Sequence, residues 1–209
     1  MGIVTVSAPY GAAGAEVAPA VAERLGLPFH DRAIPVQVAG RLGVPVAEAE
    51  ANDGTVVSGL WRLVASLGTM PDPVGGVLPT SELPDARAYR QQTERVLTEI
   101  AEGAGGVVLG RAAAMVLGGR ADALHVRLDG PADRRLAAAV ARSGRPADEV
   151  RHEMEGADRA REAYVRHFYR CDPAGPRSYH LVIDSTVLSL ATVIDVIVTA
   201  ARGRGIGLR

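Results

Sequence analysis

A short run of small residues, Gly11-Ala-Ala-Gly14, separates an apolar segment from a helical one near the start of the chain. Backbone N–H groups in a turn between a strand and a helix can point at one anion, and the helix N-terminus adds partial positive charge. Glycine and alanine also let a phosphate approach the backbone closely, because they carry no large side chain. The pattern favours a phosphate-binding loop. The alternative is a small-residue turn that packs the helix against the strand.

The chain contains no lysine, so all 23 of its basic residues are arginines. The usual phosphate-loop pattern, G-x-x-x-x-G-K-[ST], has a lysine beside the phosphates; in register on Ala8 to Glu16, that position is Gly14. Phosphoryl transfer requires charge on several oxygens to be neutralised, and the planar arginine fork can bind phosphate bidentately. No lysine side chain can neutralise phosphate charge in this protein, so arginine side chains are the candidates for that role.

Two arginines are candidates for phosphate contact. Arg111 follows the apolar segment 106–109 after one glycine, Gly110, at the junction between a predicted strand and the next helix. Arg90 lies on an amphipathic helix that also carries Arg87 and Arg95. The alternative for each is an ordinary arginine on a helix surface.

A long charged helix is predicted over 147–170, and it carries Asp158 and Arg161. Residues three apart lie on one helical face. This pair could close over a ligand, or it could belong to a solvated face. Asp129 and Asp184 each end an apolar strand, where a carboxylate can hold Mg²⁺ through water or cap the following turn.

Apolar β-branched runs alternate with helical patterns along the chain, which predicts an α/β fold with a parallel sheet covered on both faces. Ligands of such sheets bind beyond the carboxyl ends of the strands. Strands are expected at 3–6, 28–31, 106–109, 123–128 and 180–184, and helices at 16–25, 34–42, 46–51, 56–67, 86–101, from 110, 132–142, 147–170 and 189–202. The Gly-, Pro- and Asp-rich stretch 52–85 is the least predictable.

Composition narrows the functional classes. A chain of 209 residues that is 47% hydrophobic can bury one sizeable core. A net charge of −1 gives no reason to expect nucleic-acid or membrane binding. Cys171 is the single cysteine, so an internal disulfide and a cysteine-based zinc site are excluded, and the scattered histidines predict no metal site. We expect a cytoplasmic protein.

Several blocks in a fixed order resemble the cytidylate kinase-like family. They are Ile3-Val-Thr-Val-Ser-Ala-Pro-Tyr-Gly-Ala-Ala-Gly-Ala-Glu-Val17, Leu25-Gly-Leu-Pro-Phe-His-Asp31, Val107-Val-Leu-Gly-Arg111, Val126-Arg-Leu-Asp-Gly-Pro131 with Asp133-Arg134, and Leu181-Val-Ile-Asp-Ser-Thr-Val-Leu-Ser-Leu190. Together they cover nearly the whole chain, apart from 52–85.

The resemblance implies a P-loop nucleoside monophosphate kinase fold with a five-stranded parallel sheet and a helical lid. It implies one domain over 1–209, with an acceptor-binding helical insertion at about 34–103, a lid at about 144–178 and a frayed tail at 203–209. The implied reaction moves the ATP γ-phosphoryl group to CMP or a related small phosphorylated acceptor, with Mg²⁺. The expected partners are small nucleotides, and self-association is left open.

The resemblance also implies roles for individual residues. Those expected to hold the ATP phosphates are Gly11, Ala12, Ala13, Gly14 and Ala15, with Glu16 beside them. Asp31 would lie at the acceptor nucleoside, Arg90 and Arg111 at the acceptor phosphate, and Asp158 and Arg161 on the lid; Arg111, Asp158 and Arg161 are the catalytic candidates.

The sequence also departs from the family pattern. Besides the lysine, it lacks the arginine of the Gly-Gly-Arg-Glu run, which reads Ala13-Gly-Ala-Glu16 here, and Ala112 replaces a carboxylate. A relative that binds a nucleotide or phosphorylated metabolite without catalysis, as a sensor or partner module, is therefore the second hypothesis.

Overall fold

The computed structural model describes residues 2–31, 86–110 and 112–207, with side chains from Arg90 onward in the second segment. Its sheet has five strands in the order β2-β3-β1-β4-β5, and all four pairings are parallel. The strands are β1 (Ile3–Ser7), β2 (Phe29–His30), β3 (Gly106–Leu109), β4 (Ala123–Asp129) and β5 (Leu181–Asp184). The predicted fold class and strand positions are confirmed.

Strand β1 is central because its side chains suit burial on both faces. Ile3, Val4 and Val6 are at most 1% exposed, and β-branched residues pack well on a pleated surface. Ile3 lies opposite Gly106 on β3 and opposite Ala123 on β4. The segment that follows β1 therefore begins at the middle of the carboxyl edge of the sheet.

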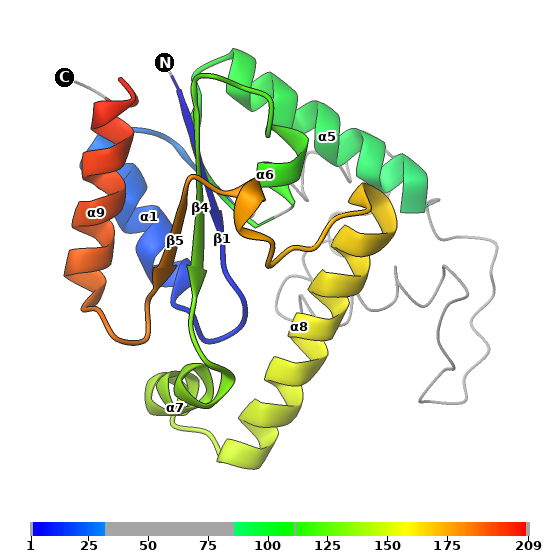
Figure 1. Ribbon diagram of the computed structural model, residues 1–209, viewed down its shortest axis with the longest axis vertical. Helices are drawn as coiled ribbons and strands as arrows, with labels where there is room; N and C mark the ends of the chain where they lie inside the picture. Colours follow the sequence, from blue (N-terminus) through cyan, green and yellow to red (C-terminus); the bar gives the residue numbers. More distant parts are fainter. Residues whose placement is uncertain (1, 32–85, 111, 208–209) are drawn as a thin grey trace.

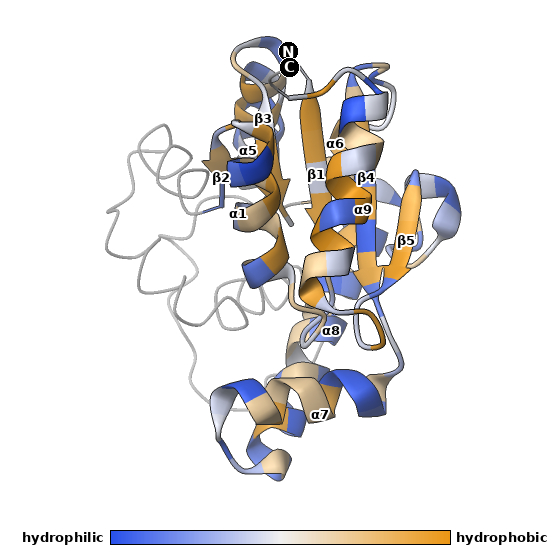
Figure 2. Ribbon diagram, turned by 90° about the vertical axis from the view of Figure 1, so that its left-hand side faces the viewer, coloured by the Kyte–Doolittle hydropathy of each residue, from blue (hydrophilic) through white to orange (hydrophobic). Residues whose placement is uncertain are grey.

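Helices cover both faces of the sheet (Figure 1). Helices α1 (Gly14–Leu25) and α9 (Leu190–Gly203) pack on one face and enclose the larger apolar core. Helices α5 (Ala86–Glu102) and α6 (Ala113–Val116) lie on the other face, over a smaller cluster. Figure 2 shows apolar residues concentrated on the strands and on the inner sides of these helices.

A helical hairpin extends beyond the carboxyl ends of the strands. It consists of α7 (Ala132–Ser143) and α8 (Ala147–Tyr169), joined at Gly144, whose φ of 65° suits glycine. In Figure 1, α7 lies below the ends of β4 and β5, and α8 runs back toward α5. The hairpin thus faces the edge of the sheet where ligands of parallel sheets bind.

The helices expected at 34–42, 46–51 and 56–67 lie outside the described residues. Beyond α9, Ile206 is 2% exposed and its N–H donates to the carbonyl of Ala201. The chain is therefore packed up to this residue, whereas fraying was expected from Gly203. In the described segments, no helix is both long and apolar enough to cross a membrane.

Candidate functional site

The loop between β1 and α1 has a backbone shape suited to an anion. Gly11 has φ of 84° and Ala13, the residue before α1, has φ of 60°, so both are left-handed. Such residues turn nearby N–H groups toward one side of a loop. No described residue accepts a hydrogen bond from the N–H of Gly11, Ala13 or Gly14. These three donors, together with the N–H of Ala15, thus remain at the N-terminus of a helix of 12 residues.

Close packing explains the glycines of this loop. A Cβ atom on Gly11 would lie 2.4 Å from the carbonyl oxygen of Arg135 on α7, and one on Gly14 would lie 2.7 Å from the Cβ of Ala8. The loop is also tied to the strands, because the Ser185 hydroxyl donates to the carbonyl of Ala12 at 2.9 Å. Gly11 thus lies directly against α7, and the loop is held from both sides.

Arginines from α7 reach the loop. One terminal nitrogen of Arg135 (Nη1) donates to the carbonyl of Tyr10 and to the Asp158 carboxylate, both at 2.7 Å. Nη2 of Arg142 donates to the carbonyl of Gly11 at 2.7 Å, while its Nε lies 3.3 Å from the Glu16 carboxylate. These guanidinium groups bring positive charge to a loop that lacks lysine.

Asp158 connects α8 to the same loop. Its Oδ1 accepts from the backbone N–H of Tyr10 at 2.8 Å, and Arg161 lies 3.3 Å from the same oxygen. Its Oδ2 accepts from Arg135. A carboxylate with several charged hydrogen bonds is firmly held. The two hairpin residues expected from the sequence, Asp158 and Arg161, are thus brought to the loop.

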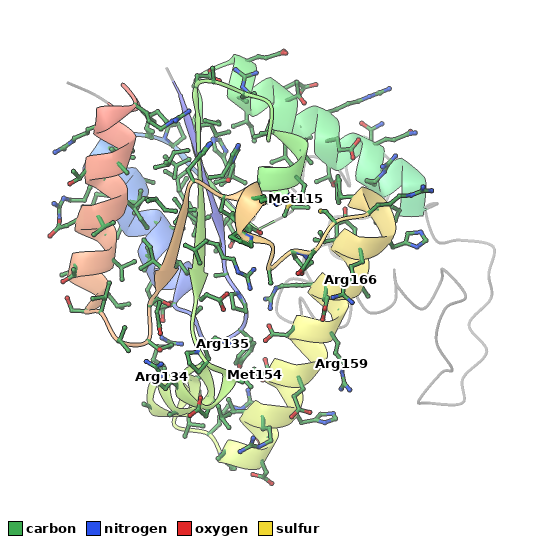
Figure 3. The ribbon with its side chains drawn as sticks, viewed as in Figure 1. Met115, Arg134, Arg135, Met154, Arg159 and Arg166 are labelled. Atoms are coloured by element: carbon green, nitrogen blue, oxygen red, sulfur yellow. The ribbon has the colours of Figure 1, made fainter. Side chains whose placement is uncertain are left out.

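Tyr10 joins the loop to the hairpin through its side chain as well. It packs against a small apolar cluster formed by Leu136, Ala139, Val150 and Met154 of α7 and α8. Burial, and then the nearby Glu153 carboxylate, raise the pKa of the Tyr10 phenol. Figure 3 shows Arg135 and Met154 between α7 and α8, beside the end of the sheet.

The other expected site residues lie elsewhere. Glu16 is in the first turn of α1, as expected, and Ala15 lies there too, because the helix begins at Gly14, two residues before the start that the sequence predicts. Asp31 follows β2 at the far edge of the sheet. Arg90 lies 3.6 Å from Glu94 and stacks 5.6 Å from the ring centre of Phe168, so it joins α5 to the end of α8. Arg111 lies outside the described residues.

The carboxylates at the strand ends already have partners. Asp129 accepts from Arg127 Nε and from the N–H of Gly130, and it makes no side-chain cap to α7. Asp184 accepts from the N–H and the hydroxyl of Thr186, which hold its pKa below the ordinary value, with Arg134 3.4 Å away. Of the two roles expected for these carboxylates, capping of the following turn is therefore the one that the contacts of Asp184 show. The described residues contain no cluster of three metal-ligating side chains.

Sequence reasoning missed Tyr10, Arg135 and Arg142. The spacing of the two arginines contained a signal, because residues seven apart lie on one face of a helix. What it could not reveal is that this face docks on the loop, which depends on how the hairpin folds back.

Comparison with known proteins agrees with this architecture. The model of the cytidylate kinase-like family matches residues 3–187. A crystal structure of an uncharacterized protein from Eubacterium ventriosum is similar, with a TM-score of 0.67 and 15% identity over 97% of this chain and 99% of that one.

Two kinases of known structure share the fold. Shikimate kinase from Acinetobacter baumannii, in complex with shikimate, has a TM-score of 0.52 and 15% identity over 97% of this chain and 94% of its own. A sugar kinase from Janibacter has a TM-score of 0.52 and 15% identity over 100% of this chain and 99% of its own.

A curated relative matches only in part. The uronate isomerase of Corynebacterium glutamicum is 27% identical over 139 residues, which are 66% of this chain and 26% of that protein. The chain thus spans about a quarter of the length of this relative.

Proposed function

The chain belongs to the cytidylate kinase-like family, and from this premise we propose that it transfers the γ-phosphoryl group of ATP to CMP or a related small phosphorylated acceptor. Family membership and a P-loop kinase fold support a nucleotide-dependent phosphotransferase. The choice of ATP as donor and of CMP as acceptor is the proposal.

One observation carries it: the N–H groups of Gly11, Ala13 and Gly14 have no hydrogen-bond acceptor among the described residues, and two α7 arginines donate to carbonyls of the same loop. Backbone donors at a helix N-terminus bind phosphate oxygens, and the helix dipole favours negative charge there. The loop therefore takes the donor phosphates, as the sequence predicts for Gly11 to Ala15.

The missing lysine is replaced by guanidinium groups from the hairpin. Arg135 pairs with Asp158, and Arg142 with Glu16. Phosphate oxygens would compete with these carboxylates for the same N–H donors. Because charge develops on the transferred group, donors that are already positioned lower the barrier. Arg135 and Arg142 are then the groups that neutralise this charge.

The residues fit a nucleotide phosphate better than they fit a dedicated metal cage. Small side chains leave the backbone of Gly11 to Ala15 open to an anion, and Mg²⁺ usually reaches such sites on the phosphates, with one or two carboxylates and water. Asp129 is the carboxylate that would assist, because Ser185 links its carbonyl to that of Ala12. The metal would neutralise phosphate charge.

A second candidate function is nucleotide binding without turnover. It is favoured by Asp158, which already occupies the Tyr10 N–H, and by the lack of lysine. The loss of charge that acts mainly at the transition state lowers the rate more than it lowers binding.

The test is an ADP-release assay with ATP or GTP and Mg²⁺ across all nucleoside monophosphates, combined with calorimetric binding of ADP. The names of the similar proteins recommend shikimate, sugars and uronates as further acceptors. Turnover with CMP supports the proposal, and binding without turnover supports the second candidate. Neither binding nor turnover would overturn both.

Arg135→Gln provides the matched comparison. It keeps a polar side chain but removes the charge, and a lost charged hydrogen bond costs roughly 1.5–3 kcal/mol, so kcat/KM should fall by about tenfold to a hundredfold. Arg159→Gln, on the outer side of α8 (Figure 3), removes the same charge away from the loop and should leave kcat/KM unchanged.

A further inference from the structure

A second cavity lies on the α6 face of the sheet, away from the loop. It has a volume of about 300 Å³ and lies between α6, β4 and the chain that leaves α8. We call it the α6 cavity; the lining residues that matter here are Met115, His125, Cys171, Arg177, Tyr179 and His180. His125 is the third residue of β4, toward its amino end, whereas the phosphate loop follows the carboxyl end of β1.

The inner wall of the cavity carries a buried polar atom without a partner. His125 is 2% exposed, and its Nδ1 is 2.8 Å from the Thr5 hydroxyl oxygen. Its Nε2 has no hydrogen-bond partner of ordinary geometry within the described part of the chain, although the Leu117 carbonyl lies near enough to the ring to raise its pKa. Either tautomer therefore leaves one donor or acceptor unmet, which is costly in a buried group and is often relieved by a ligand or water.

Two further donors lie on the same wall. The Nδ1 of His180 accepts from the backbone N–H of His125 at 2.9 Å, so the ring proton of neutral His180 is on Nε2. The two imidazoles stack with their centres 5.0 Å apart. Arg177, on the short 3₁₀ helix Pro176–Ser178, is exposed and makes no ion pair with any described carboxylate.

The charges of the side chains that line the α6 cavity favour an anionic ligand. Arg177 and two imidazoles line the cavity, and no described Asp or Glu does. Met115 and the ring of Tyr179 supply an apolar surface beside them, and Figure 3 shows Met115 projecting from α6. Ligand sites are commonly apolar clefts with a few convergent polar groups.

From this arrangement we infer that the α6 cavity binds a small organic anion, a carboxylate or a phosphate monoester, with its acid group on Arg177 and the two histidines. The anion selects the tautomer in which Thr5 donates to Nδ1 of His125 and Nε2–H donates to the ligand. The apolar part of the ligand packs on Met115 and Tyr179. This site does not depend on the proposed phosphotransfer.

The alkylation rate of Cys171, the single cysteine of the chain, can be used to measure ligand binding in the α6 cavity. Cys171 lines the cavity and is partly exposed, and burial together with the Asp172 charge raises the pKa of its thiol. Alkylation is therefore best followed at pH 8.5, where more thiolate forms. The probes are benzoate, phenyl phosphate and benzamide, which share one ring and differ in the charge of the attached group.

We expect benzoate or phenyl phosphate to slow alkylation of Cys171 at least threefold, with a saturable dependence on concentration. Benzamide should need at least a tenfold higher concentration to give the same protection. The anion that protects Cys171 at the lower concentration shows whether the cavity prefers a carboxylate or a phosphate monoester. Arg177→Gln should weaken protection at least tenfold, whereas Arg159→Gln should not change it. The histidine ring signals in NMR should shift with the same dissociation constant.

Three results would overturn the inference: no saturable protection by either anion, equal protection by benzamide, or unchanged protection in Arg177→Gln. Since Arg177 is exposed, this variant should fold, and circular dichroism checks that it does. None of these readouts requires turnover, so a failure here is distinguishable from a failure of the proposed function.

Discussion

The side chain of Asp158 on α8 binds the backbone of Tyr10 in the loop, with its Oδ1 2.8 Å from the Tyr10 nitrogen. The hairpin therefore holds a carboxylate at the place where a phosphate oxygen would bind. Arg135, 2.7 Å from the other carboxylate oxygen, would be shared between Asp158 and such a ligand. If the proposed function holds, the Asp158 carboxylate competes with an incoming phosphate for Arg135.

Replacing this carboxylate should expose the competition. In Asp158→Asn the negative charge is lost, so Arg135 becomes available to an external anion, while the amide oxygen can still accept from the Tyr10 N–H. We expect the Kd for inorganic pyrophosphate, measured by calorimetry, to fall by about tenfold, which corresponds to roughly 1.4 kcal/mol. Asp172→Asn, which removes an exposed carboxylate bound to the N–H of Ala174, is the control. Weaker or unchanged binding in Asp158→Asn would contradict the competition.

Tyr10 should anchor the hairpin mainly through its ring, while its hydroxyl, beside the Glu153 carboxylate, contributes less. Tyr10→Ala removes the contact with Leu136 and Met154 and should lower the local opening free energy of α7 and α8 by about 2 kcal/mol. Hydrogen exchange across 132–169 should then be faster, while exchange in β1 and β4 stays slow. Tyr10→Phe keeps the ring and should resemble the unchanged protein. Uniformly faster exchange in the sheet would argue against a local anchor.

Gly11 should tolerate no side chain, for two separable reasons. Its φ of 84° strains any other residue, and a Cβ would lie 2.4 Å from the carbonyl of Arg135. Gly144 has φ of 65° with nothing within 4 Å, so Gly144→Ala measures the strain alone, about 1 kcal/mol. Gly11→Ala should cost at least twice as much free energy of unfolding. Equal losses of unfolding free energy in Gly11→Ala and Gly144→Ala, measured by chemical denaturation, would mean that a Cβ at residue 11 does not clash with α7.

Acid should destabilise the fold through His125. Burial, with the nearby His180 and Arg204 charges, lowers the pKa of His125 to about 4 despite the opposing Leu117 carbonyl; the value in an unfolded chain is about 6.5. Between these values the unfolded chain binds more protons, so stability is full above about pH 6.5 and falls as the pH drops toward 4. The complete loss is on the order of 3 kcal/mol.

The measurement is the free energy of unfolding in urea at pH 7, 6 and 5, before most carboxylates titrate. His125→Asn can still accept from Thr5 but does not titrate, so its stability should depend less on pH than that of the unchanged protein. His180, whose pKa is lowered by burial and then by Arg204, contributes in the same direction, which His180→Asn tests separately. Parallel pH profiles for the protein and His125→Asn would remove His125 as the cause.

The sheet could be predicted because each strand is specified by the residue types of a short stretch of sequence. Ile3 to Val6 and Val107 to Leu109 are short apolar runs bounded by turn residues, and each forms a strand where expected. The loop after β1 was predictable for the same reason, since Gly11 and Gly14 allow close approach of backbone atoms. Local composition is enough for such features.

The rest of the site depends on contacts between distant residues. Asp158 lies 148 positions from Tyr10, and no local pattern specifies that they meet. On α7, Arg134, Arg135 and Arg142 are equivalent in sequence, yet Arg134 pairs with Asp184 while the other two reach the loop. The direction of each side chain is fixed only when the hairpin packs on the sheet.

The positively charged ties between the hairpin and the loop are all guanidinium groups, those of Arg135 and Arg142, and this has a regulatory consequence. Acetylation of a lysine removes its charge, but this chain contains no lysine. Lysine acetylation therefore cannot weaken the hydrogen bonds that Arg135 and Arg142 of α7 donate to the carbonyls of Tyr10 and Gly11.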